Sequence, residues 1–239
     1  MAELTWPEAA ERGQSLLVIP LGSTEQHGPH LPLSTDTDIA GALATGLAAV
    51  RPDVLVAPAL PYGASGEHAG FPGTLSIGLE ALEHLLIELV RSASETVSRV
   101  LLLNAHGGNC SAVRQAVALL QSEGRDVRTW SPRWDGDAHA GRTETSVQLA
   151  LGCRVGPERP RGATEPLARL LPRMRAEGVR AVSDNGVLGD ASGASVAEGQ
   201  ALLAAAVEDP RAYVATWPPL RPLAHAARCL PAEDVRGVG

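Results

Sequence analysis

Short, continuous apolar runs recur along this chain, and each run stops at a cluster of polar residues and glycines. The runs at 15–20, 54–57 and 99–103 have no polar alternation, which is typical of strands buried on both faces of a sheet. A further strand is expected at 127–130. Segments with helical spacing separate the strands, and the expected helices cover 36–50, 79–91, 111–123, a stretch starting near residue 143, 167–177 and 195–207.

Strands that alternate with helices predict an α/β fold with a mostly parallel sheet covered on both faces. At 239 residues and 24.8 kDa the chain suits one large α/β domain over residues 1–239, although length alone also permits two smaller ones. The last stretch, 217–239, is rich in proline and is expected to be irregular.

The composition excludes several function classes. Aromatic residues make up only 3% of the chain, so Ala, Leu and Val must build the core. A formal net charge of -7 gives no electrostatic support to a nucleic-acid surface. Every basic residue is arginine, which excludes catalysis by a lysine Schiff base or a phosphate-binding loop with its lysine.

The cysteines and the first residues suggest a compartment. Cys110, Cys153 and Cys229 lack metal-binding or redox spacing, and a sparse, odd set fits a reducing compartment better than a disulfide framework. The N-terminal stretch is acidic and lacks the apolar core of a signal peptide. No apolar run is long enough to span a membrane. We therefore expect a cytoplasmic protein without a membrane partner.

Polar clusters follow the predicted strands or precede the predicted helices, at 22–36, 62–74, 104–109 and 137–144. In open α/β sheets the carboxyl ends of the strands form the ligand crevice. The sequence therefore predicts that these clusters converge at one edge of the sheet.

Glu25, His27 and Asp36 are the first candidate metal ligands. Glu25 and His27 lie two apart on an extended segment, so their side chains point the same way. Asp36, at a helix start, is placed to bridge two metals. Carboxylates with neutral imidazoles suit Zn²⁺, Mn²⁺ or Fe²⁺. Taken singly, each residue is equally well interpreted as a helix cap or a surface polar group.

Histidines after later strands extend this hypothesis. His106 follows an apolar strand and is flanked by small residues, which favours a ligand, although a loop histidine bonded to its neighbours is the commoner case. His139 and Glu144 are five apart and fit a loop histidine followed by a glutamate in a first helical turn. One of the pair would shuttle a proton, and the other would be a ligand or base.

The remaining histidines differ in context. His30 and His68 lie in the polar loops and would orient ligands. His84 lies in an expected helix and His225 in the tail, which favours structural or exposed roles. Cys110 permits a cysteine-hydrolase alternative, but no feature marks it as an activated thiolate.

Several motifs together resemble the creatininase family of amidohydrolases. They are Ile19-Pro-Leu-Gly-Ser-Thr-Glu-Gln-His-Gly-Pro-His-Leu-Pro-Leu with Asp36, Tyr62-Gly-Ala-Ser-Gly-Glu-His, Phe71-Pro-Gly-Thr, Asn104-Ala-His-Gly-Gly-Asn, and His139-Ala-Gly with Glu144-Thr-Ser. The resemblance covers residues 15–205, and the first motif is long and specific.

The resemblance implies a three-layer α/β/α sandwich, a dinuclear metal site and a homo-oligomer. Glu25 and His106 would bind one divalent cation, His27 the other, and Asp36 would bridge them. Creatininase carries a glutamate ligand where this chain has Gly108, so creatinine is not the expected substrate and Glu144 is the candidate replacement. Glu67, with Gly107 and Gly108, is expected to orient ligands or contact the substrate.

Within the family, Gly186-Val-Leu-Gly-Asp and the segments around Glu67 and His139 resemble the subgroup of the mycofactocin system. That resemblance implies release of a C-terminal Val-Tyr-derived dipeptide from a modified ribosomal precursor peptide. The mechanism expected is attack by metal-bound hydroxide, with His139 passing a proton to the leaving amine. The alternatives are a deformylase or other hydrolase of small cyclic amides, and a non-catalytic metal-binding module.

Overall fold

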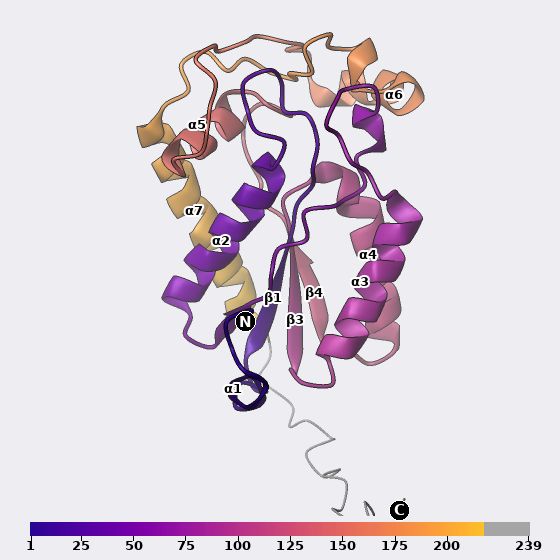
Figure 1. Cartoon of the computed structure of the whole chain (residues 1–239), viewed down its shortest axis with the longest axis vertical. Coiled ribbons are helices and arrows are strands. Elements are labelled where there is room, and N and C mark those ends of the chain that lie inside the picture. The colour runs from indigo at the N-terminus through magenta and orange to yellow at the C-terminus, as the bar shows by residue number, and fades with distance from the viewer. Residues whose placement is uncertain (218–239) are drawn as a thin grey trace, which may run out of the picture.

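A four-stranded, all-parallel sheet forms the centre of the molecule, with the strands in the order β2-β1-β3-β4 (Figure 1). The computed structural model describes residues 1–217, so the tail predicted at 217–239 lies, apart from Trp217, outside the described residues. The strands are β1 (Leu16–Leu21), β2 (Val54–Val56), β3 (Arg99–Asn104) and β4 (Val127–Trp130).

Helices cover both faces of the sheet, as the α/β prediction requires. The helices α2, α5 and α7 pack together on one face, and α3 and α4 pack together on the other (Figure 1). Their bounds are α2 (Thr35–Val50), α3 (Leu79–Ala93), α4 (Cys110–Ser122), α5 (Arg142–Ala150) and α7 (Val196–Ala215). The three-layer α/β/α architecture expected from the resemblance is confirmed.

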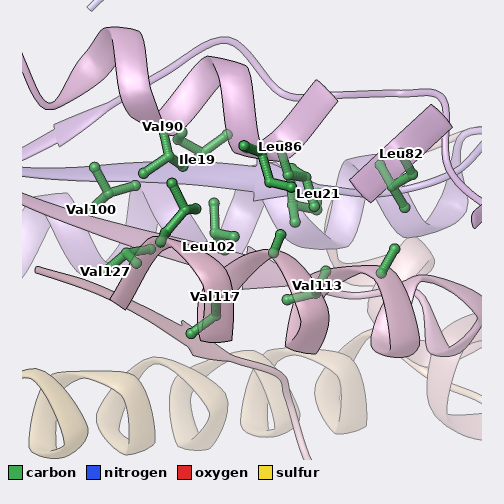
Figure 2. Close-up of a cluster of buried hydrophobic side chains, with 14 of the residues drawn as sticks. Ile19, Leu21, Leu82, Leu86, Val90, Val100, Leu102, Val113, Val117 and Val127 are labelled. Atoms are coloured by element: carbon green, nitrogen blue, oxygen red, sulfur yellow. The ribbon is translucent and has the colours of Figure 1, made fainter. Parts of the chain in front are cut away.

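Strand β1 shows why the sequence specifies two cores. Its side chains alternate between faces, so Leu17, Ile19 and Leu21 pack in the cluster under α3 and α4 (Figure 2). Leu16 and Val18 instead pack in the cluster under α2, α5 and α7. Because both clusters are apolar, the strand carries a continuous apolar run with no polar alternation.

The strand order places the functional loops at a switch in chain direction. After β1 the chain passes through α2 to the edge strand β2, and it then crosses back through α3 to β3 on the other side of β1. The carboxyl ends of β1 and β3 are neighbours, with Leu21 paired to Asn104. Ligand sites of open α/β sheets form at such a position.

The predicted helix bounds agree within a residue or two, with one exception. The helix predicted to end at 207 continues to Ala215 through Pro210. That prediction was wrong because Ala206, Pro210 and Val214 share a buried stripe, and this packing outweighs the hydrogen bond that proline removes. A short helix that the sequence analysis did not predict, α1 (Trp6–Ala10), starts with a capping box between Thr5 and Glu8.

Residues 131–195, which we call the covering segment, lie over the carboxyl ends of the strands (Figure 1). This segment contains α5, α6 (Leu167–Glu177) and long irregular stretches. A small separate cluster of Leu170, Met174, Val179 and Leu188 holds α6 in place. No helix in residues 1–217 is long and apolar enough to cross a membrane.

Candidate metal centre and substrate cleft

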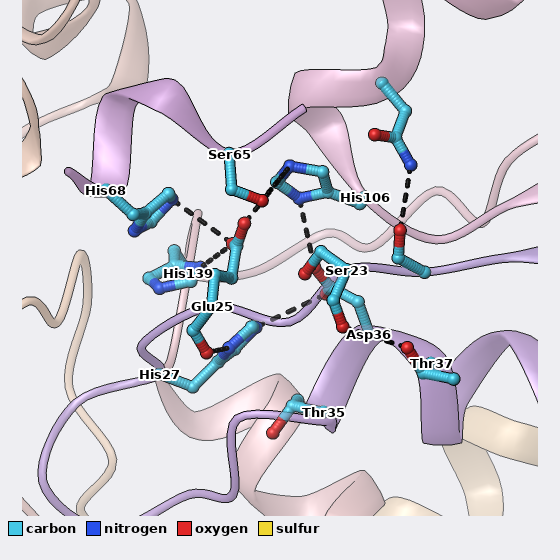
Figure 3. Close-up of polar contacts among 12 residues, drawn as sticks. Ser23, Glu25, His27, Thr35, Asp36, Thr37, Ser65, His68, His106 and His139 are labelled. Carbon is cyan, nitrogen blue, oxygen red and sulfur yellow. Dashed lines mark hydrogen bonds and ion pairs between the residues drawn. The ribbon is translucent and has the colours of Figure 1, made fainter. Parts of the chain in front are cut away.

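The loop after β1 brings two candidate ligands back toward the start of α2. Ser23 fixes this return: its hydroxyl donates to Asp36 Oδ2 at 2.7 Å, and its carbonyl accepts from Thr37 Oγ1 at 2.9 Å (Figure 3). Asp36 is 2% exposed, and neither it nor Ser34 caps α2 with its side chain. The interpretation of Asp36 as a helix cap is therefore wrong, and its carboxylate faces the site.

Asn109 ties together the loops that follow β1, β2 and β3. Its Oδ1 accepts from the backbone of Ala64 at 2.9 Å, while its Nδ2 donates to the carbonyl of Gly22 and to Asn104 Oδ1. A Cβ at Gly63 would lie 2.4 Å from Asn109 Oδ1, so this close approach requires glycine. The same network fixes the position of His106 at the end of β3.

The covering segment adds His139 and Glu144. Ala140 has a positive φ of 53°, a conformation that non-glycine residues rarely adopt. This turn lets the backbone of Ala140 donate to Glu144 Oε2 at 2.6 Å, in the first turn of α5. His139 pairs with Leu188 in an antiparallel bridge. The expected arrangement, a loop histidine before a helix-start glutamate, is therefore present.

These side chains converge on one buried cluster, and Figure 3 labels all of them except Glu144. Glu25, Asp36 and His106 bring ligand atoms within 4.8 Å of one another, and so do His27, Asp36 and Glu144. Asp36 belongs to both groups, with Oδ1 at 3.3 Å from His27 Nε2 and Oδ2 at 3.0 Å from His106 Nδ1. A bridging carboxylate between two cations requires this arrangement.

Three histidines of the cluster are oriented by backbone carbonyls. His27 Nδ1 donates to the carbonyl of Glu25 at 3.1 Å, and His106 Nε2 donates to the carbonyl of Ala64 at 3.1 Å. His139 Nε2 lies 2.9 Å from the carbonyl of Gln26. Because a carbonyl only accepts, each ring carries a hydrogen on the nitrogen that faces it, and its second nitrogen lies on the side of the carboxylates.

The cluster contains buried carboxylates whose negative charge must be compensated by protons or cations. Both carboxylate oxygens of Glu25 are buried without a conventional hydrogen bond, although His68 Nε2 lies 3.2 Å from Oε1 and His106 Nε2 lies 3.1 Å from Oε2. Burial raises the pKa of this group to about 7. Burial alone would lower the pKa of His27 and His106. The carboxylates of Asp36 and Glu25 oppose that effect and, with neighbouring groups, raise both pKa values to about 10. Buried carboxylates that hold protons on neighbouring imidazoles fit a site in which divalent metal ions replace those protons.

Of the histidines in the cluster, His68 and His139 are held neutral. Burial lowers the pKa of His68 to about 3, and burial together with the charge of His27 holds the pKa of His139 well below its ordinary value. A neutral imidazole can accept a proton or bind a metal, whereas the protonated form can do neither.

The residues expected to support the ligands lie close to the centre. His68 Nε2 is 3.2 Å from Glu25 Oε1. His30 Nε2 is 2.9 Å from Thr145 Oγ1, next to Glu144 in α5. Burial, with the charge of Arg159, lowers the pKa of His30 to about 4. His30 therefore supports α5 rather than touching the ligand atoms.

Gly108 has no room for a side chain. A Cβ at this position would lie 2.2 Å from the carbonyl of Ala64, 2.4 Å from His106 Nε2 and 2.7 Å from Glu67 Oε1. A glutamate ligand at 108 is therefore incompatible with this backbone. Glu144, from the covering segment, contributes the carboxylate beside His27 and Asp36 instead.

A cleft of about 780 Å³ opens onto the cluster. Glu25, His106 and His139 line its floor, and Glu67, Gly107 and Gly108 line it beside them. The apolar side chains of α6 that line it are Leu167, Leu171 and Met174. A site of this size with an apolar wall is suited to a peptide-sized or drug-sized ligand.

Three buried polar residues of the site were not singled out from the sequence, namely Ser23, Gln26 and Ser65. Ser65 Oγ lies 3.4 Å from His106 Nε2. Ser23 and Gln26 stand within the first motif, beside the predicted ligands, which is the signal that would have found them. Cys110 accepts a weak hydrogen bond from Asn104 Nδ2 at 3.6 Å and is absent from the metal-binding groups among residues 1–217.

The fold places a buried cluster of residues that could hold metal ions at the carboxyl edge of a parallel sheet. A family profile described as creatininase, creatinine amidohydrolase, matches residues 2–214, and the chain belongs to the creatininase family. Creatinine amidohydrolases cleave amide bonds, so the chain is a member of an amidohydrolase family.

Within that family, the chain is 52% identical over 216 residues to a protein of Mycolicibacterium smegmatis named mycofactocin precursor peptide peptidase, covering 86% of this chain and 87% of that one. A protein of the same name from Mycobacterium ulcerans is 48% identical over 227 residues, covering 90% and 87%. These similarities confirm the resemblance inferred from the motifs.

Solved creatininase structures share the fold. A mutant creatininase superposes with a TM-score of 0.79 at 27% identity, covering 92% of this chain and 98% of that chain. Further creatininase structures of similar fold are named for a Zn-Zn type and for Mn, so these neighbours bind metals.

Proposed function

We propose that this chain is a dinuclear, metal-dependent peptidase that acts on the mycofactocin precursor peptide. The observation that carries the proposal is the buried cluster in which the carboxylates of Glu25, Asp36 and Glu144 lie close to the imidazole nitrogens of His27 and His106. The names of the relatives at 48 to 52% identity supply the substrate. The resemblance further implies release of a C-terminal Val-Tyr-derived dipeptide.

The donor set fits two divalent cations, for which Zn²⁺, Fe²⁺ and Mn²⁺ are all chemically suitable. Glu25, Asp36 and His106 would hold one, and His27, Asp36 and Glu144 would hold the other. When bound, such a pair lowers the pKa of a shared water and polarises the scissile carbonyl. Glu144 replaces the carboxylate that creatininase is expected to carry at the position of Gly108.

The protein's own groups complete the reaction. The free Nδ1 of His139 faces Glu25 Oε1 at 3.9 Å, so it is placed to accept a proton at the cluster and deliver it to the leaving amine. Gly107 and Gly108 line the cleft, and their backbone N–H groups would stabilise charge on the substrate carbonyl. The apolar side chains of α6 that line the cleft would limit the access of water on their side.

The cleft also fits the proposed substrate. Its apolar wall on α6 suits the large side chains of a Val-Tyr-derived fragment, while its open mouth accommodates the rest of a precursor peptide.

A separate expectation is a homo-oligomer. Tyr62, Leu75, Ile77 and Leu79 are exposed apolar side chains, and sedimentation of the purified protein tests whether a second copy covers them.

Elemental analysis combined with a chelation and add-back assay tests the proposed function. We expect two divalent ions per chain, loss of cleavage of the modified precursor peptide on chelation, and recovery on adding metal. Activity that survives complete removal of metal contradicts the dinuclear mechanism. Turnover of a formylated nucleotide intermediate in place of the peptide favours the deformylase alternative.

Two variants test the remaining alternatives. A Cys110→Ser variant is expected to keep full activity, whereas a cysteine hydrolase would lose it and would tolerate chelators. A metal-binding module without catalysis would retain its metals and show no peptide cleavage under any condition. Cleavage that depends on both metal and His139 contradicts both alternatives.

A further inference from the structure

The Gln26 side chain lies at the junction of the metal cluster and the covering segment, and it is 4% exposed. Its Oε1 accepts from the backbone of Gly28 at 2.8 Å, which fixes the orientation of the amide. Its Nε2 then has three neighbours: His68 Nδ1 at 2.8 Å, His139 Nε2 at 3.0 Å and the carbonyl of Gly186 at 3.1 Å.

An amide nitrogen has only two hydrogens, so it can donate to only two of these three neighbours, and the third must have another hydrogen-bond partner. His139 Nε2 also lies 2.9 Å from the carbonyl of Gln26, which can only accept. If His139 carries its hydrogen on Nε2 and donates to that carbonyl, the two amide hydrogens go to His68 Nδ1 and to Gly186. Every polar group in the set is then satisfied. The opposite tautomer leaves the Gln26 carbonyl without this donor and has three acceptors competing for two hydrogens.

The proton positions on both rings follow from this arrangement. His68 accepts at Nδ1 and therefore carries its hydrogen on Nε2, the nitrogen 3.2 Å from Glu25 Oε1. His139 carries its hydrogen on Nε2 and leaves Nδ1 bare on the side of Glu25. Nδ1 is the atom that accepts the proton in the mechanism above.

We propose that Gln26 is a positioning residue that holds His68 and His139 in these tautomers through its backbone carbonyl and its side-chain amide. The link to proton transfer rests on the proposed function, whereas the tautomers themselves do not. Gly186 helps to hold the Gln26 side chain, because its carbonyl accepts from Gln26 Nε2. Its φ is 77°, and a Cβ there would lie 1.9 Å from Gln26 Oε1, so only glycine leaves the amide in place.

The isosteric variant Gln26→Glu removes the amide N–H donor and keeps the size and shape of the side chain. It keeps an acceptor for Gly28 and replaces the amide donor by an oxygen. The hydrogen of His68 is then expected to move to Nδ1, where it can donate to the new carboxylate. Two-bond ¹H–¹⁵N spectra of the zinc-loaded protein, labelled on histidine, report the tautomer of each ring, and His68→Ala and His139→Ala variants assign the signals.

For the wild type, the spectra are expected to show hydrogen on Nε2 of both rings. In Gln26→Glu we expect the changed His68 tautomer, unchanged zinc content, an unchanged KM and a kcat lower by about 10- to 100-fold, the usual cost of losing a residue that orients functional groups. Gln121→Glu is the matched control, because Gln121 donates to the carbonyl of Val127 far from the cleft.

Wild-type tautomers other than these, or a His68 tautomer unchanged in Gln26→Glu, overturn the proposal. An unchanged kcat in a variant with the altered tautomer overturns its catalytic part. Gly186→Ala is the second test, since it displaces the same amide without adding charge, and it should alter the same two histidine signals. If the wild type shows the expected tautomers but does not cleave the peptide, the proposed function fails while the positioning role stands.

Discussion

The two halves of the site are built in different ways. The ligand loops, residues 22–36 and 104–109, leave strands at the centre of the sheet and rest on its two cores. In the covering segment, α5 packs against α2 and α7, whereas α6 rests on a small separate cluster, and the segment has unusual backbone at Ala140 and Gly186. Under the proposed function, the ligand loops would supply most of the metal donors, and the covering segment would supply the proton acceptor, one carboxylate and the α6 wall. Metal affinity and substrate handling are thus placed on parts of the fold that can change separately.

Removing the bridging carboxylate should have the largest effect. Asp36→Ala is expected to lose metal and activity together, with a loss of at least about 10³-fold, because bound metal contributes several kcal/mol to the transition state. Metal content and peptide cleavage measured on the same preparation check this. Asp38→Ala is the control, since Asp38 stands in the same helical turn and accepts from Ser34 instead. Full activity of Asp36→Ala without metal would contradict the division between the halves.

A variant of the covering segment should separate metal binding from catalytic rate. His139→Ala is expected to keep its metals and lose about 10²- to 10⁴-fold in kcat, the usual contribution of a general acid or base. His84→Ala, on the exposed surface of α3, is the matched control. If His139→Ala lost metal in proportion to its loss of activity, His139 would be a metal ligand. The assignment of proton transfer to this residue of the covering segment would then be wrong.

Metal affinity should depend on pH through the ligand loops. In the metal-free protein the pKa values of His27 and His106 are raised to about 10, so below that pH a metal must displace their protons. Affinity should therefore fall as the pH is lowered from 9, by roughly tenfold per unit for each proton displaced. The fall should steepen below about pH 7, where Glu25 also takes up a proton. Competition titrations against a zinc chelator at several pH values measure the slope, and a flat profile would contradict the assignment.

The smallest expected effect concerns local stability. Met174 is buried in the cluster under α6, and Met174→Ala removes about 2 kcal/mol or more of packing from it. Hydrogen exchange should become faster in residues 163–190 and stay unchanged in β3. Leu86→Ala, in the core beside the sheet, should instead lower the global stability. Equal acceleration in β3 for both variants would show that the two halves unfold as one unit.

The sequence predicted the ligand loops well because their signals are local. An apolar run that ends in a polar cluster identifies a strand end, and parallel strand ends share one edge, so the proximity of Glu25, Asp36 and His106 follows from pattern alone. That the Asp36 carboxylate faces the cluster and does not cap α2 depends on its bond to Ser23, a contact across a turn. The extension of α7 past Pro210 depended on burial against other elements, which no local pattern reports.

The covering segment could be predicted only in outline. The order of His139 and Glu144 indicated a loop followed by a helix start. The approach of these residues to Glu25 and His27 depends on the positive φ of Ala140. The small residues around Ala140 do not allow this backbone conformation to be predicted from the sequence. Contacts between residues far apart in sequence, such as Gln26 with Gly186, are fixed by the way the segment folds back over the sheet.

The crowding around Gly108 limits which substitutions this scaffold accepts. The Ala64 carbonyl, the His106 ring and the Glu67 side chain occupy the space that a side chain at 108 would need. A glutamate introduced at 108 would therefore have to displace the loop after β2 before it could approach the cluster. A single substitution at 108 is thus expected to damage the site rather than to add a carboxylate, and a carboxylate there would require a rebuilt loop as well.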